Sequence, residues 1–170
     1  MVFTKMFESI HSKVIDRNNL NEIREKHPNA KIVLCSGCFD ILHSGHAVFF
    51  NDCKKQGDIL VVSVGTDAVI RSYKGPDRPI NNEQNRVHLV AALEDVDYAI
   101  LGDEKMDEDN IDFHDAVEQI KPNALVINDD SGGIDGKKEF CKQNAIELVI
   151  LERKVPPYLE ATSTTKILGV

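Results

Sequence analysis

The sequence predicts an α/β domain of the Rossmann-like type, in which a doubly wound, five-stranded parallel sheet lies between two layers of helices. Five short apolar runs rich in Val, Ile and Leu recur along the chain, and helix-length amphipathic stretches separate them. Continuous apolar runs of this length are typical of strands that are buried on both faces of a parallel sheet. Alternation of strands and helices requires right-handed crossovers, which build a three-layer domain.

The elements follow one another in a regular order. The expected strands lie at residues 31–36, 58–64, 97–101, 124–128 and 146–151. The expected helices lie at about 44–56, 82–95, 110–121 and 135–144. Pro122 directly follows the third helix, as expected for a helix end. All 170 residues fit one domain, in which residues 1–30 add an N-terminal extension with a helix near residues 18–25.

Composition and charge limit the function. Hydrophobic residues make up 42% of the chain, which is enough to build one core. No apolar run approaches the ~20 residues that cross a bilayer, and no secretory signal opens the chain, so we expect a cytoplasmic protein without a membrane partner. The net charge is −8, and residues 102–118 hold eight acidic residues and one lysine, a net −7 that we interpret as a solvated acidic surface. A long nucleic-acid partner is disfavoured, because binding one needs a basic face.

Residues 35–46, CSGCFDILHSGH, follow the first expected strand and contain two cysteines and two histidines, each pair three apart. A zinc site is one interpretation, but only four residues separate the two pairs, where a Cys2His2 site usually has about a dozen. A redox C-x-x-C motif would open a helix directly after its second cysteine, whereas Phe39 and Asp40 follow here. Without a secretory signal, the four cysteines are expected to be reduced thiols.

The two histidines favour a phosphate-binding turn. If a helix opens at residue 43, His43 and His46 lie on one side of it, and Gly45 between them lets a ligand approach closely. The unpaired N–H groups of a helix start suit a phosphate, and Gly37 supplies the turn off the strand. Two polar residues that cap a helix beside Asp40 explain the same pattern equally well on chemistry alone.

The segment GCFDILHSGH (37–46) resembles the G-x-F-D-x-x-H-x-G-H signature of the cytidylyltransferase-like nucleotidyltransferases. The resemblance extends from about Val14 to Ile167. It implies that His43 and His46 are catalytic, because the family uses them to contact the phosphates of a nucleoside triphosphate and stabilise the transition state. The nucleotide-binding residues that it implies in this segment are Gly37, Cys38, Phe39 and Gly45.

Residues 64–86 are expected to form an irregular basic loop, because Gly75-Pro76 and Arg78-Pro79 interrupt regular structure. On charge alone, a solvated loop is as good an interpretation as a phosphate-binding one. K-G-x-x-R-P-I-N resembles the heptose-phosphate adenylyltransferases, which implies that Lys74 is a catalytic contact to the phosphates. The residues implied at the acceptor or its phosphate are Asp40, Thr66, Asp67, Arg78 and Arg86. Asp40 is expected to orient the loop rather than to bind a metal directly. No other residue is expected to be a direct metal ligand.

The C-terminal residues 161–168, ATSTTKIL, predict a capped helix start, and capping alone would explain them. The family places such a run against the triphosphate. The residues that match its pattern are Ser163, Thr164 and Thr165. The arginine that related cytidylyltransferases carry just before this run is missing, so this phosphate-binding cation is either absent or supplied by Arg153 or Lys166.

Residues 126–133, VINDDSGG, end the fourth expected strand, and a simple turn would explain them. They resemble the G-D-D-x-x-G of glycerol-3-phosphate cytidylyltransferases more than the K-G-G-D-Y of heptose-phosphate adenylyltransferases. The resemblance implies that Asn128 and Asp129 bind the nucleotide, and it leaves CTP and ATP open.

Taken together, the resemblance implies transfer of a nucleoside monophosphate from CTP or ATP to a small phosphorylated sugar or polyol, of the heptose phosphate or glycerol 3-phosphate type, with release of pyrophosphate. Mg²⁺ is the expected cofactor, held through the triphosphate, and a homodimer is the expected assembly. A nucleotide-binding module without turnover and a zinc-binding protein remain the alternatives.

Overall fold

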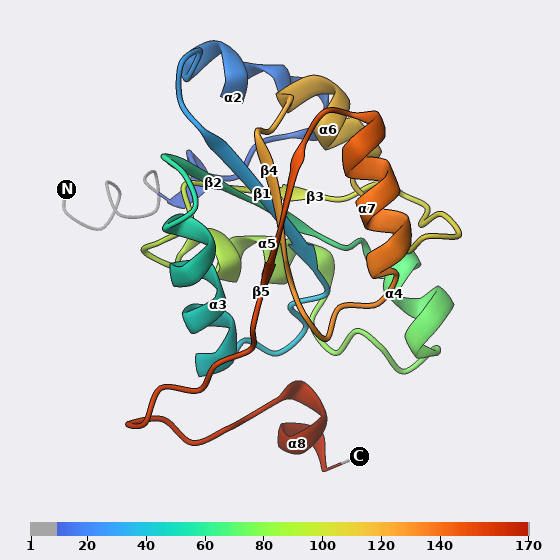
Figure 1. Cartoon of the computed structure of the whole chain (residues 1–170). Helices are drawn as coiled ribbons and strands as arrows, with labels where there is room; N and C mark the ends of the chain where they lie inside the picture. Colours follow the sequence, from blue (N-terminus) through green and yellow to red (C-terminus); the bar gives the residue numbers. More distant parts are fainter. Residues whose placement is uncertain (1–9, 170) are drawn as a thin grey trace, which may run out of the picture.

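A computed structural model describes residues 10–169, and its centre is a sheet of five parallel strands (Figure 1). The strands are β1 (Ile32–Gly37), β2 (Ile59–Val64), β3 (Tyr98–Leu101), β4 (Ala124–Asn128) and β5 (Glu147–Leu151). Their order across the sheet is β3-β2-β1-β4-β5. The structure confirms the predicted fold class, and each observed strand lies within one residue of its predicted bounds.

Helices flank the sheet and connect its strands. The elements outside the sheet are the 3-10 turn η1 (Arg17–Asn19) and the helices α2 (Asn21–Lys26), α3 (Ser44–Lys54), α4 (Asp67–Lys74), α5 (Glu83–Ala91), α6 (His114–Ile120), α7 (Ile134–Gln143) and α8 (Thr164–Leu168). The N-terminal extension contains the predicted helix as α2, shifted a few residues toward the C-terminus, while residues 1–9 lie outside the described part of the chain. None of the described helices is long and apolar enough to cross a lipid bilayer.

Helix α4 occupies a stretch that the sequence predicted to be irregular. Thr66 caps the helix, since its side chain accepts a hydrogen bond from the N–H of Val69. Val69 and Ile70 are buried and attach the helix to the domain. Gly75, with φ of 93°, ends it. The prediction of a loop from residue 64 onward was therefore wrong for this stretch, because the cap and the two apolar residues outweigh the proline-rich segment that follows.

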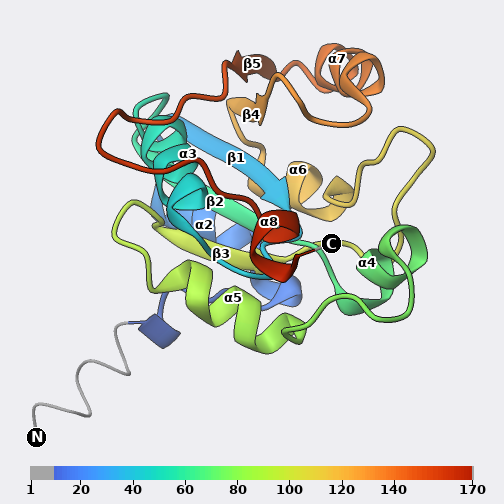
Figure 2. The same ribbon diagram turned by 90° about the horizontal axis from the view of Figure 1, so that it is seen from below.

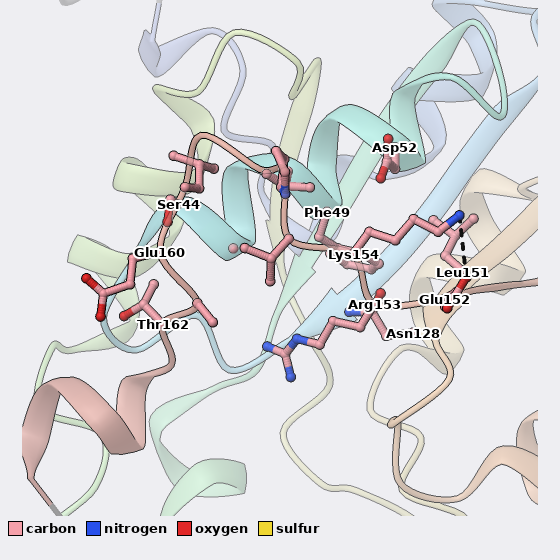
Figure 3. Close-up of a pocket in the computed structure, with 16 residues that line it drawn as sticks. Ser44, Phe49, Asp52, Asn128, Leu151, Glu152, Arg153, Lys154, Glu160 and Thr162 are labelled. Carbon is pink, nitrogen blue, oxygen red and sulfur yellow. Dashed lines mark ion pairs between the residues drawn. The ribbon is translucent and has the colours of Figure 1, made fainter.

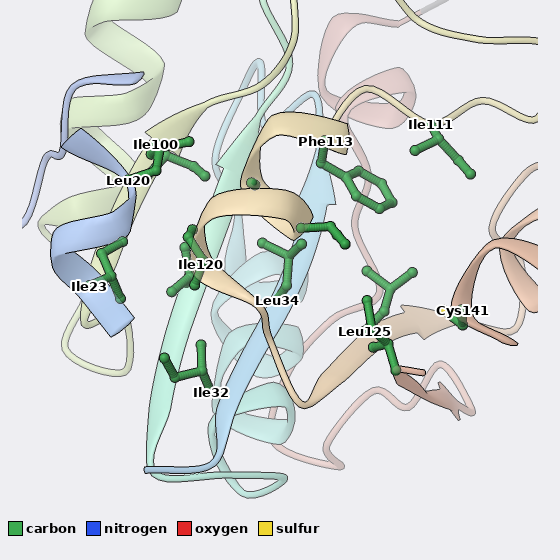
Figure 4. Packing of buried hydrophobic residues seen from close by; sticks show 14 of the residues in the cluster. Leu20, Ile23, Ile32, Leu34, Ile100, Ile111, Phe113, Ile120, Leu125 and Cys141 are labelled. Atoms are coloured by element: carbon green, nitrogen blue, oxygen red, sulfur yellow. The ribbon is translucent and has the colours of Figure 1, made fainter. Parts of the chain in front are cut away.

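The side chains of alternate strand residues build two cores, one on each face of the sheet. Ile32 and Leu34 of β1 pack with residues of α2, α6 and α7 (Figure 4). Val33 and Cys35 of the same strand pack on the opposite face with residues of α3 and α5. The domain is therefore the predicted three-layer structure, and Figure 2 shows the two helical layers on either side of the strands.

The strand order reverses beside β1, which pairs with β2 on one side and β4 on the other. The chain leaves β1 toward α3 on one face, and it leaves β4 toward α7 on the opposite face. These departures open a crevice at the carboxyl ends of the two strands, where ligands of doubly wound sheets bind. Helix α8 lies across this end of the sheet (Figure 2) and places the hydroxyl of Thr164 3.5 Å from the carbonyl oxygen of Ile41.

Candidate active site

The turn after β1 is held in an unusual conformation by aromatic packing. Phe39 has φ of 48°, in the left-handed region that a bulky residue rarely adopts. Its ring packs against Phe50 of α3 and meets His46 edge-on, with ring centroids 5.0 and 5.3 Å apart. A Cβ on Gly37 would lie 2.8 Å from this ring, so a larger residue there would force the ring to move. The turn then leads directly into the histidine pair at the start of α3.

His43 and His46 form a stacked pair at the start of α3. Their ring centroids lie 3.9 Å apart, and a Cβ on Gly45 would come within 3.0 Å of the His43 ring. His46 Nδ1 accepts a hydrogen bond of 3.3 Å from the backbone N–H of His43. In a neutral imidazole the proton then resides on Nε2, so His46 presents an N–H donor on its other side.

Both imidazoles favour the neutral form. Burial, followed by the positive charge of Arg153, lowers the pKa of His43. Burial lowers the pKa of His46 to about 3, with further contributions from His43, Arg153 and Lys74. His46 is therefore an uncharged hydrogen-bond donor at neutral pH, in the positive field of two neighbouring cations.

The crevice is a cavity of about 480 Å³ that runs from the start of α3 across β1 and β4. The predicted site residues that line it are Gly37, Cys38, Phe39, Asp40, Gly45, His46, Lys74, Asn128 and Thr164. His43 reaches the cavity only through its stacking on His46. Ser163 caps α8 by accepting from the N–H of Lys166 and does not line the cavity, and neither do Thr165 and Asp129. Nine of the predicted residues therefore line one cavity, whereas these four do not.

Lys74 and Arg153 are the predicted cations that line the cavity. Lys74 ends α4, where its ammonium lies 5.6 Å from the centroid of the Tyr73 ring. Arg153 follows β5 and pairs with Asp130 at 2.5 Å. Lys166, the other cation suggested by the sequence, instead pairs with the exposed Glu160 and does not line the cavity. Of the two candidates for the missing family arginine, the geometry therefore favours Arg153.

A family model for cytidylyltransferase-like proteins matches residues 34–168 of the chain, which include both histidines and α8. The chain belongs to the cytidylyltransferase-like family. The match confirms the family resemblance predicted from residues 37–46. Other comparisons agree with this placement. The bifunctional protein HldE of Aliarcobacter butzleri is 32% identical over 161 residues, which cover 95% of this chain and 29% of that protein.

Further relatives of the family show the same pattern. HldE of Alcanivorax borkumensis is 38% identical over 139 residues, covering 81% of this chain and 27% of that protein. The chain thus spans less than a third of the length of these relatives. A solved lipopolysaccharide core biosynthesis protein from Thermoplasma volcanium matches with a TM-score of 0.62 at 31% identity, covering 75% of this chain and 99% of that one. Pantoate-beta-alanine ligase from Francisella tularensis shares the fold, with a TM-score of 0.61 at 19% identity over 85% of this chain and 68% of that one.

Asp40 of the family signature organises the loop between α4 and α5. Its carboxylate accepts hydrogen bonds from Arg78 Nε at 2.7 Å and from the N–H groups of Ile80 and Asn81 at 2.8 and 2.9 Å. Burial favours the protonated acid, but these hydrogen bonds outweigh it, so the pKa of Asp40 is lowered. Because these donors surround the carboxylate, Asp40 holds the loop in place, and Arg78 is engaged in the same contact.

Arg86 is fully buried and does not line the cavity. Its guanidinium donates to the carbonyl oxygens of Asn81, Cys38 and Gly65 and to the carboxylate of Asp67, at 2.7–2.8 Å. Arg86 is therefore not placed to contact an acceptor or phosphate in the cavity, and four of its five N–H groups are bonded inside the domain. Thr66 and Asp67 are likewise engaged at the start of α4 and do not line the cavity.

A second, smaller pocket adjoins the cavity between the start of α3 and the segment after β5 (Figure 3). It shares Gly45, Phe49, Asn128 and Arg153 with the cavity. Apolar side chains form much of its wall, among them Val48, Leu151, Val155 and Leu159. Figure 3 shows Arg153 and Asn128 on one side of this pocket and Ser44 and Thr162 on the other. The rest of the wall is polar or charged and includes Asp52, Glu152 and Lys154.

The two cysteines of the turn do not face a common centre. Cys35 is fully buried and its thiol contacts that of Cys53, whereas Cys38 lines the cavity. Burial raises the pKa of Cys38, so its thiol favours the protonated form. Within residues 10–169, no group of three or more His, Cys, Asp or Glu side chains is arranged to hold a metal ion. The structure therefore gives the zinc interpretation no support.

Sequence reasoning missed part of the cavity wall. The lining residues that it did not single out include Tyr73, Met106, Asn110, Asp112 and Lys137. Asp112 belongs to the stretch predicted to be a solvated acidic surface, yet only 8% of it is exposed. Its place between the apolar Ile111 and Phe113 was the available signal, since a charged residue inside an apolar run is often held in a site.

Proposed function

We propose that this chain transfers a nucleoside monophosphate from CTP or ATP to the phosphate of a small phosphorylated sugar or polyol and releases pyrophosphate. The observation that carries the proposal is the convergence on one cavity of a neutral His46 donor, the cations Lys74 and Arg153, and the start of α8. Family membership supports the reaction class.

In the proposed reaction, an oxygen of the acceptor phosphate attacks the α-phosphorus of the nucleotide in line with the leaving group. The bond from the α-phosphorus to the bridging oxygen breaks, and pyrophosphate leaves with that oxygen. A phosphate oxygen is already ionised near neutral pH, so no strong general base is required. Catalysis then depends on positioning the two substrates and on stabilising the charge that develops on the phosphate oxygens.

His46, Lys74 and Arg153 supply this stabilisation in the proposal. The Nε2–H of His46 donates to a phosphate oxygen without bringing a charge, and the stacked His43 fixes its ring. Lys74 and Arg153 approach the phosphate chain from α4 and from the end of β5. Thr164, at the first turn of α8, adds its hydroxyl and backbone N–H. The second pocket beside Arg153 is the place proposed for the base.

Mg²⁺ is proposed to be held through the substrate phosphates, because two of the carboxylates near the cavity are already engaged. The carboxylate of Asp40 is surrounded by protein donors, and that of Asp130 is paired with Arg153. A bound Mg²⁺ would neutralise charge on the phosphate chain and orient it. The homodimer expected from the family resemblance is likewise proposed, and light scattering of the purified chain would test it.

The sugar or polyol class rests on two resemblances. Residues 74–81 resemble heptose-phosphate adenylyltransferases, and a relative of known structure carries a name from lipopolysaccharide core biosynthesis. Dinucleotide-forming relatives generally carry T-x-G-H, whereas this chain has H-S-G-H at residues 43–46. A small phosphorylated sugar or alcohol is therefore the proposed acceptor, and the choice between CTP and ATP is left to experiment.

The proposal is tested by measuring pyrophosphate release from four nucleoside triphosphates, each paired with sugar 1-phosphates, glycerol 3-phosphate and small phosphonates. One pair should support turnover. His46→Ala should lower that turnover by ~10²-fold or more, the typical effect of removing one transition-state donor, while His88→Ala, at an exposed histidine of α5, should not. Nucleotide binding without pyrophosphate release from any pair would instead support a non-catalytic module.

A further inference from the structure

The cavity has a polar end to which the proposed nucleotidyl transfer assigns no role. Beyond Lys74 it is lined by Asn110 and Asp112, from the loop between β3 and α6, and by Lys137 of α7. Asp112 is 8% exposed and Lys137 is 5% exposed. Two ionisable side chains that are buried this deeply are costly to a protein unless a partner compensates them.

The fold holds Asp112 firmly at this end. The flanking Ile111 and Phe113 are fully buried in the core. The carboxylate of Asp107 accepts hydrogen bonds from the N–H groups of Asp109 and Ile111. These bonds hold the loop that leads to Asp112 in a fixed turn. The backbone carbonyl of Asp112 also accepts a hydrogen bond from the N–H of Asp103. Its side chain is therefore placed by packing and backbone bonds.

The carboxylate of Asp112 lies over the carboxyl ends of β2 and β3. One of its oxygens lies 3.2 Å from the position of a Cβ on Gly65 and 3.3 Å from that of a Cβ on Gly102. The hydroxyl of Ser63 lies 3.2 Å from the same point at Gly102 and is buried without a partner in the described part of the chain. Two polar groups therefore gather where glycine leaves room for a carboxylate.

Lys137 closes the other side of this end. Its ammonium donates to the carbonyl oxygen of Gly132, which leaves two of its three protons for other acceptors. Burial lowers its pKa, although the nearby Asp112, Asp107 and Asp109 oppose that shift. Burial, reinforced by the negative charge of Asp103, raises the pKa of Asp112 to about 6. Within residues 10–169, no other residue donates a hydrogen bond to its carboxylate.

We infer that Asp112 and Lys137 form the acceptor-recognition end of the cavity, where they bind hydroxyl groups of a polyhydroxylated phosphate. The inference rests on the proposed function and narrows its acceptor class. The Asp112 carboxylate accepts hydrogen bonds from hydroxyl groups, and Lys137 donates to an acceptor oxygen. A site with buried polar groups discriminates strongly against an analogue that lacks the matching hydroxyl, because those groups are then left unpaired.

The test compares acceptors that differ only in hydroxyl groups. Glycerol 3-phosphate is paired with propyl phosphate, and a hexose 1-phosphate is paired with its deoxy analogues, each with the nucleotide that supports turnover. The wild-type chain should prefer the hydroxylated member of the pair by about 10-fold or more in kcat/KM, as expected for one buried hydrogen bond to a charged group. Asp112→Asn should raise the acceptor KM and reduce this preference, with the nucleotide KM changed less than about 2-fold.

Matched variants separate recognition from folding. Glu108→Gln removes one exposed carboxylate from the same loop, and Lys138→Met removes the exposed lysine next to Lys137 on α7. Both should behave as wild type, whereas Lys137→Met should raise the acceptor KM. If Asp112→Asn does not fold, Lys137→Met and the wild-type preference between paired acceptors still decide the outcome.

Two failures are distinguishable. Turnover by the wild-type chain without a preference for hydroxylated acceptors, or with an unchanged preference in Asp112→Asn and Lys137→Met, would overturn the inference and leave the proposed reaction standing. Loss of turnover in His46→Ala within the same series would confirm that reaction independently. Absence of pyrophosphate release from the wild-type chain with every pair would contradict both the inference and the proposed reaction.

Discussion

The histidine pair shows how a few residues set the chemistry of the cavity. Gly37 and Gly45 each leave space that a Cβ would fill, one for the Phe39 ring and the other for the His43 ring. The rings of Phe39 and His43 in turn pack on His46 and shield part of it from water. The neutral state of His46 is therefore a consequence of packing, and the direction of its N–H follows from one backbone hydrogen bond.

This packing predicts a pH dependence of stability. His46 has a folded-state pKa of about 3, below the ordinary value of about 6.5. The unfolded chain therefore binds a proton at His46 that the folded chain does not, and stability is lost as the pH falls below the ordinary value. Between about pH 7 and about pH 5.5, the free energy of unfolding should fall by about 1 kcal/mol more for the wild type than for His46→Gln.

Urea denaturation of the two proteins at both pH values measures this difference. Carboxylates and the other histidines titrate in both proteins, so their contribution cancels to a first approximation. Equal losses in the wild type and in His46→Gln would show that His46 becomes protonated as readily in the folded chain as in the unfolded one, and the argument for a neutral donor would fail.

At the scale of elements, α4 and the loop after it fix the position of Lys74. The capped start of α4 and the glycine at its end define the helix, so Lys74 reaches the cavity from an ordered helix. The following loop is held to the turn after β1 through Asp40, whose carboxylate accepts from Arg78, Ile80 and Asn81. Elements that lie about forty residues apart in the sequence thus share one carboxylate.

The side chains of Asp40 and Arg78 should show a large coupling free energy. The side chains of Asp40 and Arg78 are 1% and 17% exposed. A double-mutant cycle with Asp40→Asn and Arg78→Met should give a coupling free energy of about 1.5–3 kcal/mol, the range for hydrogen bonds to charged groups that are shielded from water. Urea denaturation of the four proteins provides the values.

An exposed ion pair supplies the comparison for this cycle. Lys138 and Asp135 on α7 lie 2.9 Å apart, but their side chains are 56% and 96% exposed. Their cycle should give a coupling below about 1 kcal/mol, as surface pairs do. If the Asp40–Arg78 cycle gave no more than the surface pair, the loop would be held by other contacts, and Asp40 would lose its organising role.

At the scale of the whole molecule, Arg86 joins parts of the chain that surround the cavity. Its guanidinium donates to Cys38 after β1, to Gly65 after β2, to Asn81 in the loop and to Asp67 at the start of α4. A planar fork with five donors can satisfy these acceptors together, whereas a lysine cannot. Arg86 thus links the carboxyl ends of β1 and β2 to the loop between α4 and α5.

Arg86 and Arg71 both contact the carboxylate of Asp67. The contribution of the buried arginine to stability can therefore be compared with that of an exposed one. Arg86 is buried and lies 2.7 Å from Asp67, while Arg71 is 53% exposed and lies 3.5 Å from it. Arg86→Met should lower the free energy of unfolding by about 3–5 kcal/mol, because it leaves a partly buried carboxylate and several carbonyl groups unpaired. Arg71→Met should cost less than about 1 kcal/mol.

Denaturation and kinetics together check this assignment. Arg86→Lys should also be destabilised, with losses that appear in stability more than in the acceptor KM. A fully stable Arg86→Lys protein with a raised acceptor KM would instead restore the direct substrate contact that the family resemblance implied.

The sequence by itself determined the repeating pattern of the domain and the position of its main motif. Strand and helix positions followed from local apolar periodicity, and the turn at residues 37–46 followed from a short, specific spacing, because both are properties of neighbouring residues. The capped start of α8 was predictable for the same reason. The helical state of α4 was missed, since its cap and its two buried residues gain their effect only against the rest of the domain.

Only the tertiary structure decided which distant groups meet at the strand ends. It buried Arg86 among carbonyl groups, placed Arg153 at the cavity in preference to Lys166, and turned Asp112 inward from an otherwise acidic and exposed stretch. Charge and residue type in the sequence are the same for a solvated side chain and a buried one. What separates them is the free energy of removing a charge from water, and that depends on partners supplied by remote parts of the chain.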